Sequence, residues 1–274
     1  MNFNVVLPVY NGGAKIERTL SSILLQNSVL AGKDTVQCIV VDGASIDDTV
    51  QRARSFNDPR IKIISEADEG MYEALAKGLD GTMQDVTCYL SAGELFDPSA
   101  FEIVSHVLQS HSEVSWLTGR AITRNADLHI ITSELPRPFL RNLIDCGMYG
   151  TRLTVIQQES TFWRSDLTQH FDLEKLKTLK LAGDYYLWRC LAQHYELYVV
   201  NAHLGSFTNE PGQLSQTVPG AYRRELRSIR RRPKLTERFS ALIMRQWAKR
   251  VCPSETSIRT INFDHQKRSW ELSR

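Results

Sequence analysis

The chain has 274 residues, 42% of them hydrophobic and 23% charged, which is the composition of one large or two small globular domains with a sizeable core. The net charge of +2 is uneven, because residues 221–250 hold eleven Lys or Arg and two acidic side chains, whereas residues 1–220 carry a charge of −8. This acidic body excludes the composition of a nucleic-acid-binding protein.

The cysteines and the apolar segments indicate the compartment. The five cysteines show no Cys-x-x-Cys or Cys/His spacing, which argues against a zinc site and predicts reduced residues, most of them in the core. The N-terminus lacks the basic and apolar stretches of a signal peptide, and no apolar run reaches the length of a membrane-spanning helix. We therefore expect a cytoplasmic protein.

Strand and helix patterns alternate over the first hundred residues. Apolar strands are expected over residues 3–8, 36–41, 60–64 and 86–89. Helical periodicity follows the first three of them, over residues 14–26, 47–56 and 71–79. This alternation predicts a parallel sheet with right-handed crossovers.

Polar residues follow each of these strands. They are Tyr10 and Asn11, then Asp42, then Glu66 and Asp68, and finally Glu94. The carboxyl ends of parallel strands share one edge of a sheet, where ligands bind, and a carboxylate there can hold a divalent cation against a diphosphate. The alternative is that each residue caps a helix or lies in a solvated turn.

The second half of the chain differs in pattern. A helix is expected over 99–108, a strand over 114–119 and a hairpin from 121–123 and 128–131. Strands without long helices between them favour an antiparallel addition to the sheet. Phe162 and Trp163 are expected in a core strand. We divide the chain into a domain over 1–220, with halves at 1–97 and 98–220, and an extension over 221–274.

Four motifs resemble those of family 2 glycosyltransferases with the GT-A fold, over about residues 3–215. They are Val6-Leu7-Pro8-Val9-Tyr10-Asn11, Val40-Val41-Asp42-Gly43-Ala44-Ser45, Ser65-Glu66-Ala67-Asp68-Glu69-Gly70 and Leu90-Ser91-Ala92-Gly93-Glu94. The resemblance implies an α/β fold with a Rossmann-like, mostly parallel nucleotide-binding sheet, an antiparallel acceptor side and, here, basic C-terminal helices. Bacterial capsule, colanic acid and O-antigen glycosyltransferases are similar.

The resemblance also implies a donor site. The nucleotide of the sugar donor would be bound by Pro8, Val9, Tyr10, Asn11, Asp42, Asp68 and Gly70. Glu94 takes the place of the family's metal-binding Asp and would hold Mn²⁺ or Mg²⁺, although it is one methylene longer.

The remaining implied site residues come from three further segments. The sugar or the acceptor would contact Ser91, Ala92, Gly93, Gln158, Glu159 and Arg189. Asp184 matches the family's catalytic base, and it could also cap the helix that follows. Residues 211–215 resemble a loop that helps to close the active site in relatives.

The basic extension has two interpretations. Residues 221–250 are expected to be helical, with apolar residues among Arg and Lys, and such a helix suits the surface of an anionic membrane. The alternative is a helix packed on the body with a solvated basic face. The last residues, 254–274, are expected to be partly disordered or an interface arm.

The leading functional hypothesis is an inverting, metal-dependent glycosyltransferase that uses a nucleotide-sugar donor, a UDP-sugar. Its acceptor would be a saccharide or a lipid-linked saccharide in surface polysaccharide synthesis, and the enzyme would be peripheral on the inner face of the cytoplasmic membrane. One alternative is a non-catalytic relative that binds nucleotide sugars as a scaffold. It is motivated by the departures at Glu94 and at Gln157, where the family often has His. A nucleotidyltransferase is the second, but its Gly-rich phosphate loop is poorly matched by Gly12-Gly13-Ala14-Lys15.

Overall fold

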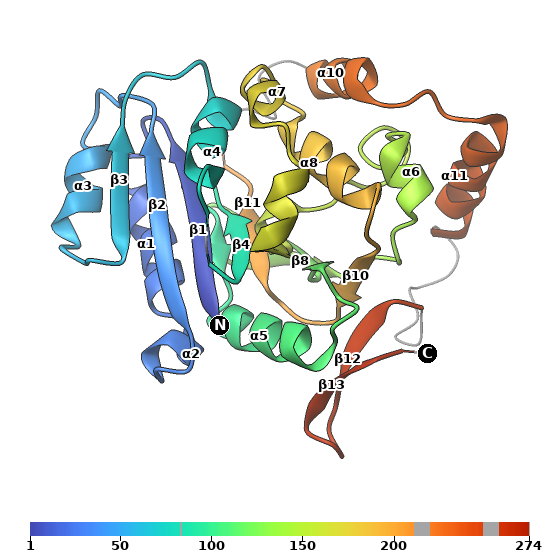
Figure 1. Cartoon of the computed structure of the whole chain (residues 1–274), viewed down its shortest axis with the longest axis horizontal. Coiled ribbons are helices and arrows are strands. Elements are labelled where there is room, and N and C mark those ends of the chain that lie inside the picture. The colour runs from blue at the N-terminus through green and yellow to red at the C-terminus, as the bar shows by residue number, and fades with distance from the viewer. Residues whose placement is uncertain (83, 211–219, 249–257, 274) are drawn as a thin grey trace.

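One large mixed sheet runs through the protein (Figure 1). The computed structural model describes residues 1–82, 84–210, 220–248 and 258–273. Within these ranges the sheet has nine strands in the order β13-β12-β10-β6-β9-β4-β1-β2-β3. The loop at 211–215 lies outside the described residues.

The first half of the chain forms the parallel part of this sheet, as the sequence predicts. The strands are β1 (Asn2–Val9), β2 (Thr35–Asp42), β3 (Ile61–Ser65) and β4 (Val86–Tyr89). β1 pairs in parallel with β2 and β4, and β2 pairs in parallel with β3. The helices between them are α1 (Lys15–Leu24), the short α2 (Asn27–Leu30), α3 (Thr49–Ser55) and α4 (Met71–Leu79).

Packed helices cover both faces of the sheet. Val5 and Leu7 of β1 belong to an apolar cluster with α1 and α5 (Ala100–Ser110), whereas Val6 belongs to a second cluster with α4 and α8 (Gly183–Ala192). The apolar run of β1 therefore suits a strand that is buried on both faces. Gly78 lets α4 approach closely, because a Cβ added there would lie 2.3 Å from Val6 Cγ1.

The second half adds antiparallel pairing. β9 (Thr161–Arg164) lies between β4 and β6 (Trp116–Thr118) and is antiparallel to both. Phe162 and Trp163 are fully buried in β9, which confirms the predicted core strand. β10 (Leu197–Val200) then pairs in parallel with β6.

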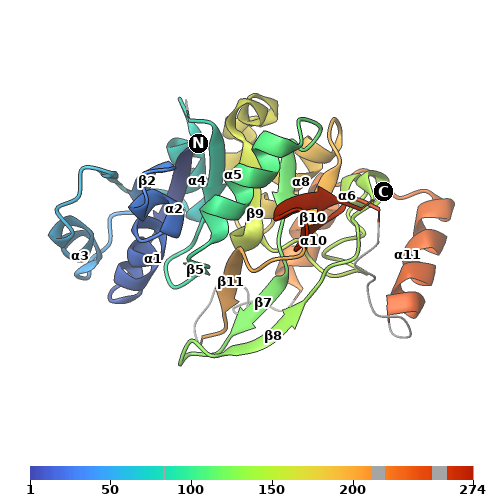
Figure 2. The ribbon, with the colours of Figure 1, turned by 90° about the horizontal axis from the view of Figure 1, so that it is seen from below.

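A smaller sheet lies beside the main one (Figure 2). In the described ranges it has the order β5-β11-β7-β8. Its strands are β5 (Leu95–Phe96), β7 (Ala121–Arg124), β8 (Ile130–Glu134) and β11 (Gly205–Thr208). The connecting elements are α6 (Arg141–Asp145), α7 (Leu173–Lys177) and the 3₁₀ turns η1 (Gln158–Ser160) and η2 (Ser165–His170).

The C-terminal extension is helical only in its first part. α10 (Ala221–Ile229) and α11 (Leu235–Ala248) agree with the prediction, but β12 (Thr260–Asp264) and β13 (Ser269–Leu272) form a hairpin. β12 pairs in parallel with β10, and Ile261 is fully buried. The prediction of a disordered or interface arm is therefore wrong for these two strands. They extend the main sheet at its edge and cover the open side of β10.

Candidate active site

The turn after β4 holds a buried carboxylate. Glu94 is 7% exposed, and its Oε2 accepts hydrogen bonds from the Ser91 amide (2.9 Å) and from Gln158 Nε2. Gly93 occupies a left-handed conformation with φ +106° that favours glycine. Ser91–Glu94 thus forms a turn around its own carboxylate.

Two threonines from other elements clamp this turn. Thr19 Oγ1 of α1 accepts from the Gly93 amide (2.8 Å) and donates to the Glu94 carbonyl (2.9 Å). Thr208 Oγ1 of β11 donates to the Gly93 carbonyl (2.9 Å). The position of the Glu94 carboxylate is therefore fixed from both halves of the protein.

Three carboxyl groups with raised pKa values gather beyond β4. Burial raises the pKa of Glu94 and that of Asp184 to about 7. Burial, followed by the charge of Glu94, raises the pKa of Glu159 well above its ordinary value. Carboxyl groups shifted by burial and by one another are typical of functional sites.

Several buried polar atoms at this point have no hydrogen-bond partner within the described residues. They are Gln158 Oε1, Glu159 Oε1 and the Tyr89 hydroxyl. Unpaired buried polar atoms are rare and cost free energy, unless a ligand or water completes them. We therefore expect a ligand that supplies hydrogen-bond donors or positive charge to these oxygens.

Asp184 lies in the first turn of α8. Its Oδ1 accepts from the Tyr185 amide (2.6 Å), and its Oδ2 accepts from the Tyr222 hydroxyl of α10 (3.3 Å). The N-cap of α8 is Ala182, so Asp184 is not the capping residue. Gly183 brings it against α4, because a Cβ there would lie 2.3 Å from the Tyr72 ring.

α10 is anchored on the segment before α8. The Glu225 carboxylate accepts from three consecutive amides, those of Lys180 (2.9 Å), Leu181 (2.6 Å) and Ala182 (2.6 Å). Leu226 is fully buried beside them. The extension therefore supplies Tyr222 to the site, which the sequence analysis missed because an aromatic residue in a basic helix gives no local signal of its partner.

The loops after β1 and β2 are joined by hydrogen bonds. The Asn11 amide donates to Ser45 Oγ (2.8 Å), and the Ile46 amide donates to Asn11 Oδ1 (3.0 Å). Tyr10 is 61% exposed beside this junction, whereas Pro8 and Val9 are buried in β1. Of this expected nucleotide loop, Tyr10 is therefore the residue with a freely accessible ring.

Asp42 and Asp68 lie next to each other across Gly43. A Cβ added to Gly43 would lie 2.8 Å from Asp68 Oδ2. Asp42 is fully buried, and its Oδ2 accepts from Ser65 Oγ (2.7 Å). Asp68 is partly exposed and accepts a hydrogen bond from the Gly70 amide (2.9 Å). Gly70 has a φ of +138°, which favours glycine. Asp42 therefore orders the turn, while Asp68 faces the rim.

The nucleotide loop adjoins the Glu94 turn. A Cβ at Gly12 would lie 3.2 Å from Cβ of Ala92, and Ser91 Oγ lies 3.7 Å from Met71 Sδ. The structure therefore brings the expected residues of the first four strand ends to one edge of the sheet, as the parallel arrangement predicts.

A pair of cations that the sequence analysis missed lies beside this turn. Lys15 Nζ is 2.7 Å from Glu210 Oε2, and Arg18 binds the other oxygen of Glu210. A Cβ at Gly93 would lie 3.0 Å from Arg18 Nη2. The available signal was the i, i+3 spacing of Lys15 and Arg18 at the start of the first helix.

Arg189 has structural partners. Its Nε is 3.2 Å from Asp145 Oδ1, and its Nη1 donates to the Ile229 carbonyl at the end of α10 (2.8 Å). These contacts hold α10 on the body. The expected contact of Arg189 with the sugar or the acceptor stays a prediction, since these partners lie on the body and in α10.

The oxygen atoms around Glu94 fit a hard divalent cation. Across the described residues, no group of three or more His, Cys, Asp or Glu side chains is arranged to hold a metal ion. The Glu94 carboxylate and the unpaired oxygens of Gln158 and Glu159 are nevertheless the donors that Mg²⁺ and Mn²⁺ prefer. A cation there would need further ligands from a bound phosphate or from water.

The described helices contain none that is long and apolar enough to cross a membrane.

Sequence comparison assigns more than half of the chain to one family. The family described as glycosyl transferase family 2 matches residues 4–166. A validoxylamine A glucosyltransferase from Streptomyces hygroscopicus is 31% identical over 112 residues, which are 40% of this chain and 25% of the relative. A PGL/p-HBAD biosynthesis glycosyltransferase from Mycobacterium bovis is 25% identical over 129 residues, 46% of this chain and 48% of the relative. This chain thus matches half or less of these relatives' lengths.

Solved structures show the same fold. Residues 1–349 of S. aureus TarS in complex with UDP-GlcNAc superpose with a TM-score of 0.61 at 14% identity, covering 80% of this chain and 61% of that one. The mannosyltransferase PcManGT from Pyrobaculum calidifontis, in complex with GDP-Man and Mn²⁺, has a TM-score of 0.50 at 17% identity, over 74% and 56% of the two chains.

The substitution Asp184→Asn is expected to stabilise the folded protein above neutral pH. The folded state raises the pKa of Asp184 from 3.8 to about 7, so folding stability falls as the pH rises between these values. Asparagine removes that loss. Because the side chain is only partly buried, we expect a gain of about 1–2 kcal/mol in the free energy of unfolding near pH 8.

Urea denaturation measures this gain, which should vanish below about pH 3, where Asp184 is protonated in both the folded and the unfolded state. Asp166→Asn, at an exposed carboxylate of η2, is the matched control and should change little. Equal stability of the wild type and Asp184→Asn near about pH 8 would show that Asp184 does not carry a buried charge.

Proposed function

Because the chain belongs to glycosyl transferase family 2, we propose that it is an inverting, metal-dependent enzyme that transfers a sugar from a UDP-sugar to a saccharide or lipid-linked saccharide acceptor in surface polysaccharide synthesis. The observation that carries this proposal is the half-buried Asp184 carboxylate, held at a helix start near the Glu94 turn and with its pKa raised to about 7. A base with a pKa near the working pH is the most effective kind.

The strand ends suit a nucleotide diphosphate. The exposed ring of Tyr10 offers a stacking surface, and Asn11, Asp68 and Gly70 line the same rim. UDP as the nucleotide is supported by the fold shared with TarS, which was crystallised with UDP-GlcNAc. The choice of nucleobase and of sugar in the donor is part of this proposal.

The proposed reaction is a single displacement. Asp184 takes the proton of an acceptor hydroxyl, whose oxygen attacks the anomeric carbon from the face opposite the nucleotide. The bond between that carbon and the diphosphate oxygen breaks, and the configuration at the carbon inverts. A divalent cation held by Glu94 would stabilise the negative charge of the leaving diphosphate.

Lys15 and Arg18 add positive charge at the place where the diphosphate would lie. They flank Gly93, and the Glu210 carboxylate is the ion-pair partner of both. A phosphate group, like a carboxylate, is anionic and offers arginine two oxygens for paired hydrogen bonds. We therefore assign the two cations to the diphosphate, which would replace Glu210 as their partner.

Donor turnover tests the proposal. UDP release from UDP-GlcNAc and UDP-glucose, with Mn²⁺ present, should fall by about 10²–10⁴-fold in Asp184→Asn, because the general base is lost. The rate of the wild type should rise with pH through about 7 as Asp184 loses its proton. Asp166→Asn serves again as the folded control, with an exposed carboxylate.

UDP binding, measured by thermal shift, should survive in Asp184→Asn. Full turnover in this variant would exclude Asp184 as the base. Binding of UDP-sugars without any turnover in the wild type would instead favour the non-catalytic, scaffold alternative.

The Glu94 pair of variants tests the metal assignment. Glu94→Ala should abolish the dependence of UDP release on Mn²⁺, whereas Glu94→Asp should keep it, because a carboxylate is retained. Titrations of Mn²⁺ at fixed donor concentration measure the difference, and thermal unfolding checks that both variants fold. An unchanged Mn²⁺ dependence in Glu94→Ala would move the metal to other ligands.

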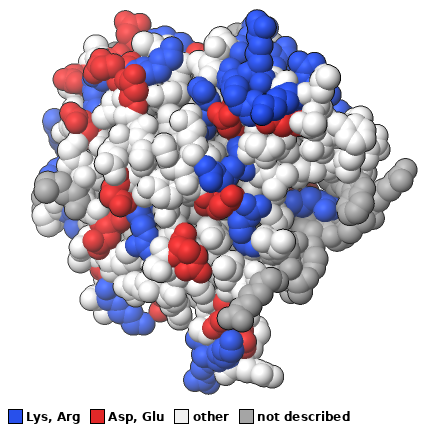
Figure 3. Space-filling model, turned by 45° about the vertical axis from the view of Figure 1, so that its right-hand side comes forward, with Lys and Arg blue, Asp and Glu red and all other residues white. Residues whose placement is uncertain are grey.

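We also propose that the C-terminal helices contact an anionic membrane surface. α11 packs on the body through Ala241 and Met244 but leaves four large apolar side chains exposed, namely Leu235 (82%), Phe239 (64%), Leu242 (46%) and Ile243 (40%). Arg and Lys side chains gather on this side of the protein (Figure 3). Arg223, Arg224 and Arg227 of α10 are among the exposed cations.

Vesicle sedimentation tests this contact. The protein should bind vesicles that contain phosphatidylglycerol and not vesicles of phosphatidylcholine alone, and binding should weaken with salt, since each cation near the surface contributes about 1 kcal/mol. Phe239→Ser combined with Ile243→Ser should weaken binding, while Ile131→Ser, at a 54% exposed site on β8, should not. Equal binding to both kinds of vesicle would contradict the proposal.

A further inference from the structure

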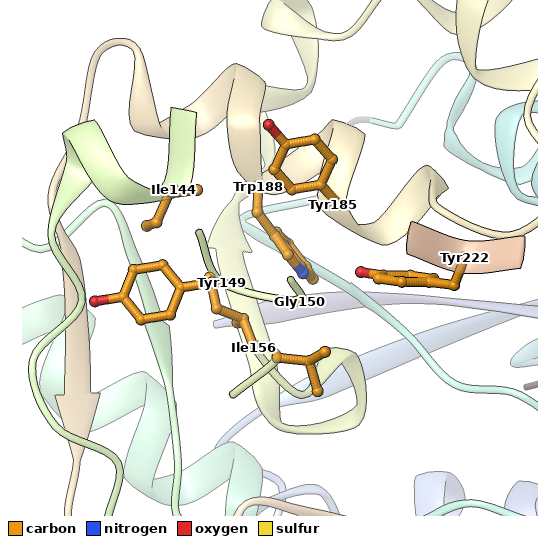
Figure 4. A pocket seen from close by; sticks show the side chains of 8 residues that line it. Ile144, Tyr149, Gly150, Ile156, Tyr185, Trp188 and Tyr222 are labelled. Atoms are coloured by element: carbon orange, nitrogen blue, oxygen red, sulfur yellow. The ribbon is translucent and has the colours of Figure 1, made fainter. Parts of the chain in front are cut away.

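A small aromatic pocket adjoins Asp184 (Figure 4). It encloses about 230 Å³ of space, part of which is open to solvent. Its walls include Ile144, Tyr149, Gly150, Tyr185, Trp188 and Tyr222, and none of its lining residues is charged. Tyr222 lines this pocket and also donates a hydrogen bond to Asp184, so the pocket lies next to the proposed general base.

The three tyrosine hydroxyls of the pocket are engaged by the protein. Tyr149 Oη accepts from the Leu140 amide (3.2 Å), and Tyr185 Oη donates to the Asp145 carbonyl (2.9 Å). Both of these hydroxyls point away from the centre of the pocket in Figure 4. Tyr149 and Tyr185 therefore present ring carbons to a ligand, whereas the hydroxyl of Tyr222 points towards Trp188.

Trp188 is different, because its polar atom is unused. The residue is 2% exposed, and its Nε1 has no hydrogen-bond partner among the described residues. The indole is held in place by stacking on Trp116 (centroids 5.8 Å apart) and by an edge contact with Trp163 (6.0 Å). In Figure 4 its nitrogen faces the space between Tyr149 and Tyr222. A fixed donor is thus aimed into the pocket.

We infer that this pocket is an acceptor subsite for a neutral, hydroxyl-bearing substituent, of which the hydroxymethyl group of a hexose is the simplest example. The oxygen of the substituent accepts the hydrogen bond of Trp188 Nε1, and its C–H groups pack on the tyrosine rings. The inference rests on the proposed function, since an acceptor must reach Asp184 to lose its proton.

The chemistry of the walls excludes other groups. A phosphate or a carboxylate would find no cation among the lining residues. A methyl group would leave Trp188 Nε1 buried without a hydrogen-bond partner, and this would weaken binding strongly because a buried unpaired donor costs free energy. Because the 230 Å³ includes open solvent, the enclosed part of the pocket is small, and it suits a substituent rather than a whole sugar ring.

The test compares paired sugars by the indole N–H resonance of Trp188. The full chain, with isotope-labelled tryptophan and with UDP and Mg²⁺ present, is titrated with methyl glycosides of glucose, galactose, mannose and N-acetylglucosamine, each beside its 6-deoxy counterpart. At least one hydroxymethyl sugar should shift the Trp188 resonance downfield, and its 6-deoxy partner should shift it much less.

Trp188→Phe assigns the resonance and should remove the difference in affinity within each pair. If this variant does not fold, single Phe substitutions at Trp116, Trp163, Trp247 and Trp270 assign it by elimination. Tyr198→Phe, at a tyrosine outside the pocket, should leave every shift unchanged.

A Trp188 resonance that responds to no sugar, or equally to both members of every pair, would overturn the inference and leave the pocket as the place of an ordered water. The proposed function fails separately, through the absence of UDP release from donors, which this binding measurement does not require. Where transfer to a hydroxymethyl acceptor is observed, the 6-deoxy acceptor should lose at least about tenfold in kcat/KM.

Discussion

The burial of Glu94, Glu159 and Asp184 at one end of β4 is the constraint on which the surrounding structure depends. Burial raises the pKa of each carboxyl group, and the charges of Glu94 and Asp184 raise that of Glu159 further. The protein tolerates this cost by fixing the groups from elements that are distant in sequence. Thr19 and Thr208 hold the Glu94 turn, and Tyr222 holds Asp184. What remains unpaired, at Gln158 and Glu159, is completed by substrate in the proposed function.

The antiparallel strand β9 makes this arrangement possible. By entering between β4 and β6, it carries η1, and with it Gln158 and Glu159, to the end of β4 where Glu94 lies. Gly205 of β11 is needed beneath η1, because a Cβ there would lie 1.8 Å from the Glu159 carbonyl oxygen. The parallel and the antiparallel parts of the main sheet therefore meet beside the Glu94 turn.

The sequence predicted the parts of the protein that are governed by local pattern. The alternation of strands and helices, and the carboxylates at the strand ends, suffice for the parallel sheet and for the shared edge of Tyr10, Asp42, Asp68 and Glu94. Contacts between distant segments were not predictable. The sequence of residues 221–229 gives no local signal that Tyr222 donates a hydrogen bond to Asp184. It also gives none that the Glu225 carboxylate accepts from the amides of residues 180–182. The polar composition of the last residues likewise concealed the hairpin, whose buried side rests on Ile261.

The anchoring of α10 by Glu225 also sets an order of events during synthesis of the chain. Residues 1–210 contain the main sheet except for the edge strands β12 and β13, together with the Glu94 turn and Asp184, and these can form as the chain leaves the ribosome. The Asp184 carboxylate gains its partner Tyr222 only after α10 emerges and Glu225 reaches the amides of residues 180–182. In the proposed function, the strand ends that would bind the donor therefore form before Tyr222 orients the carboxylate of Asp184.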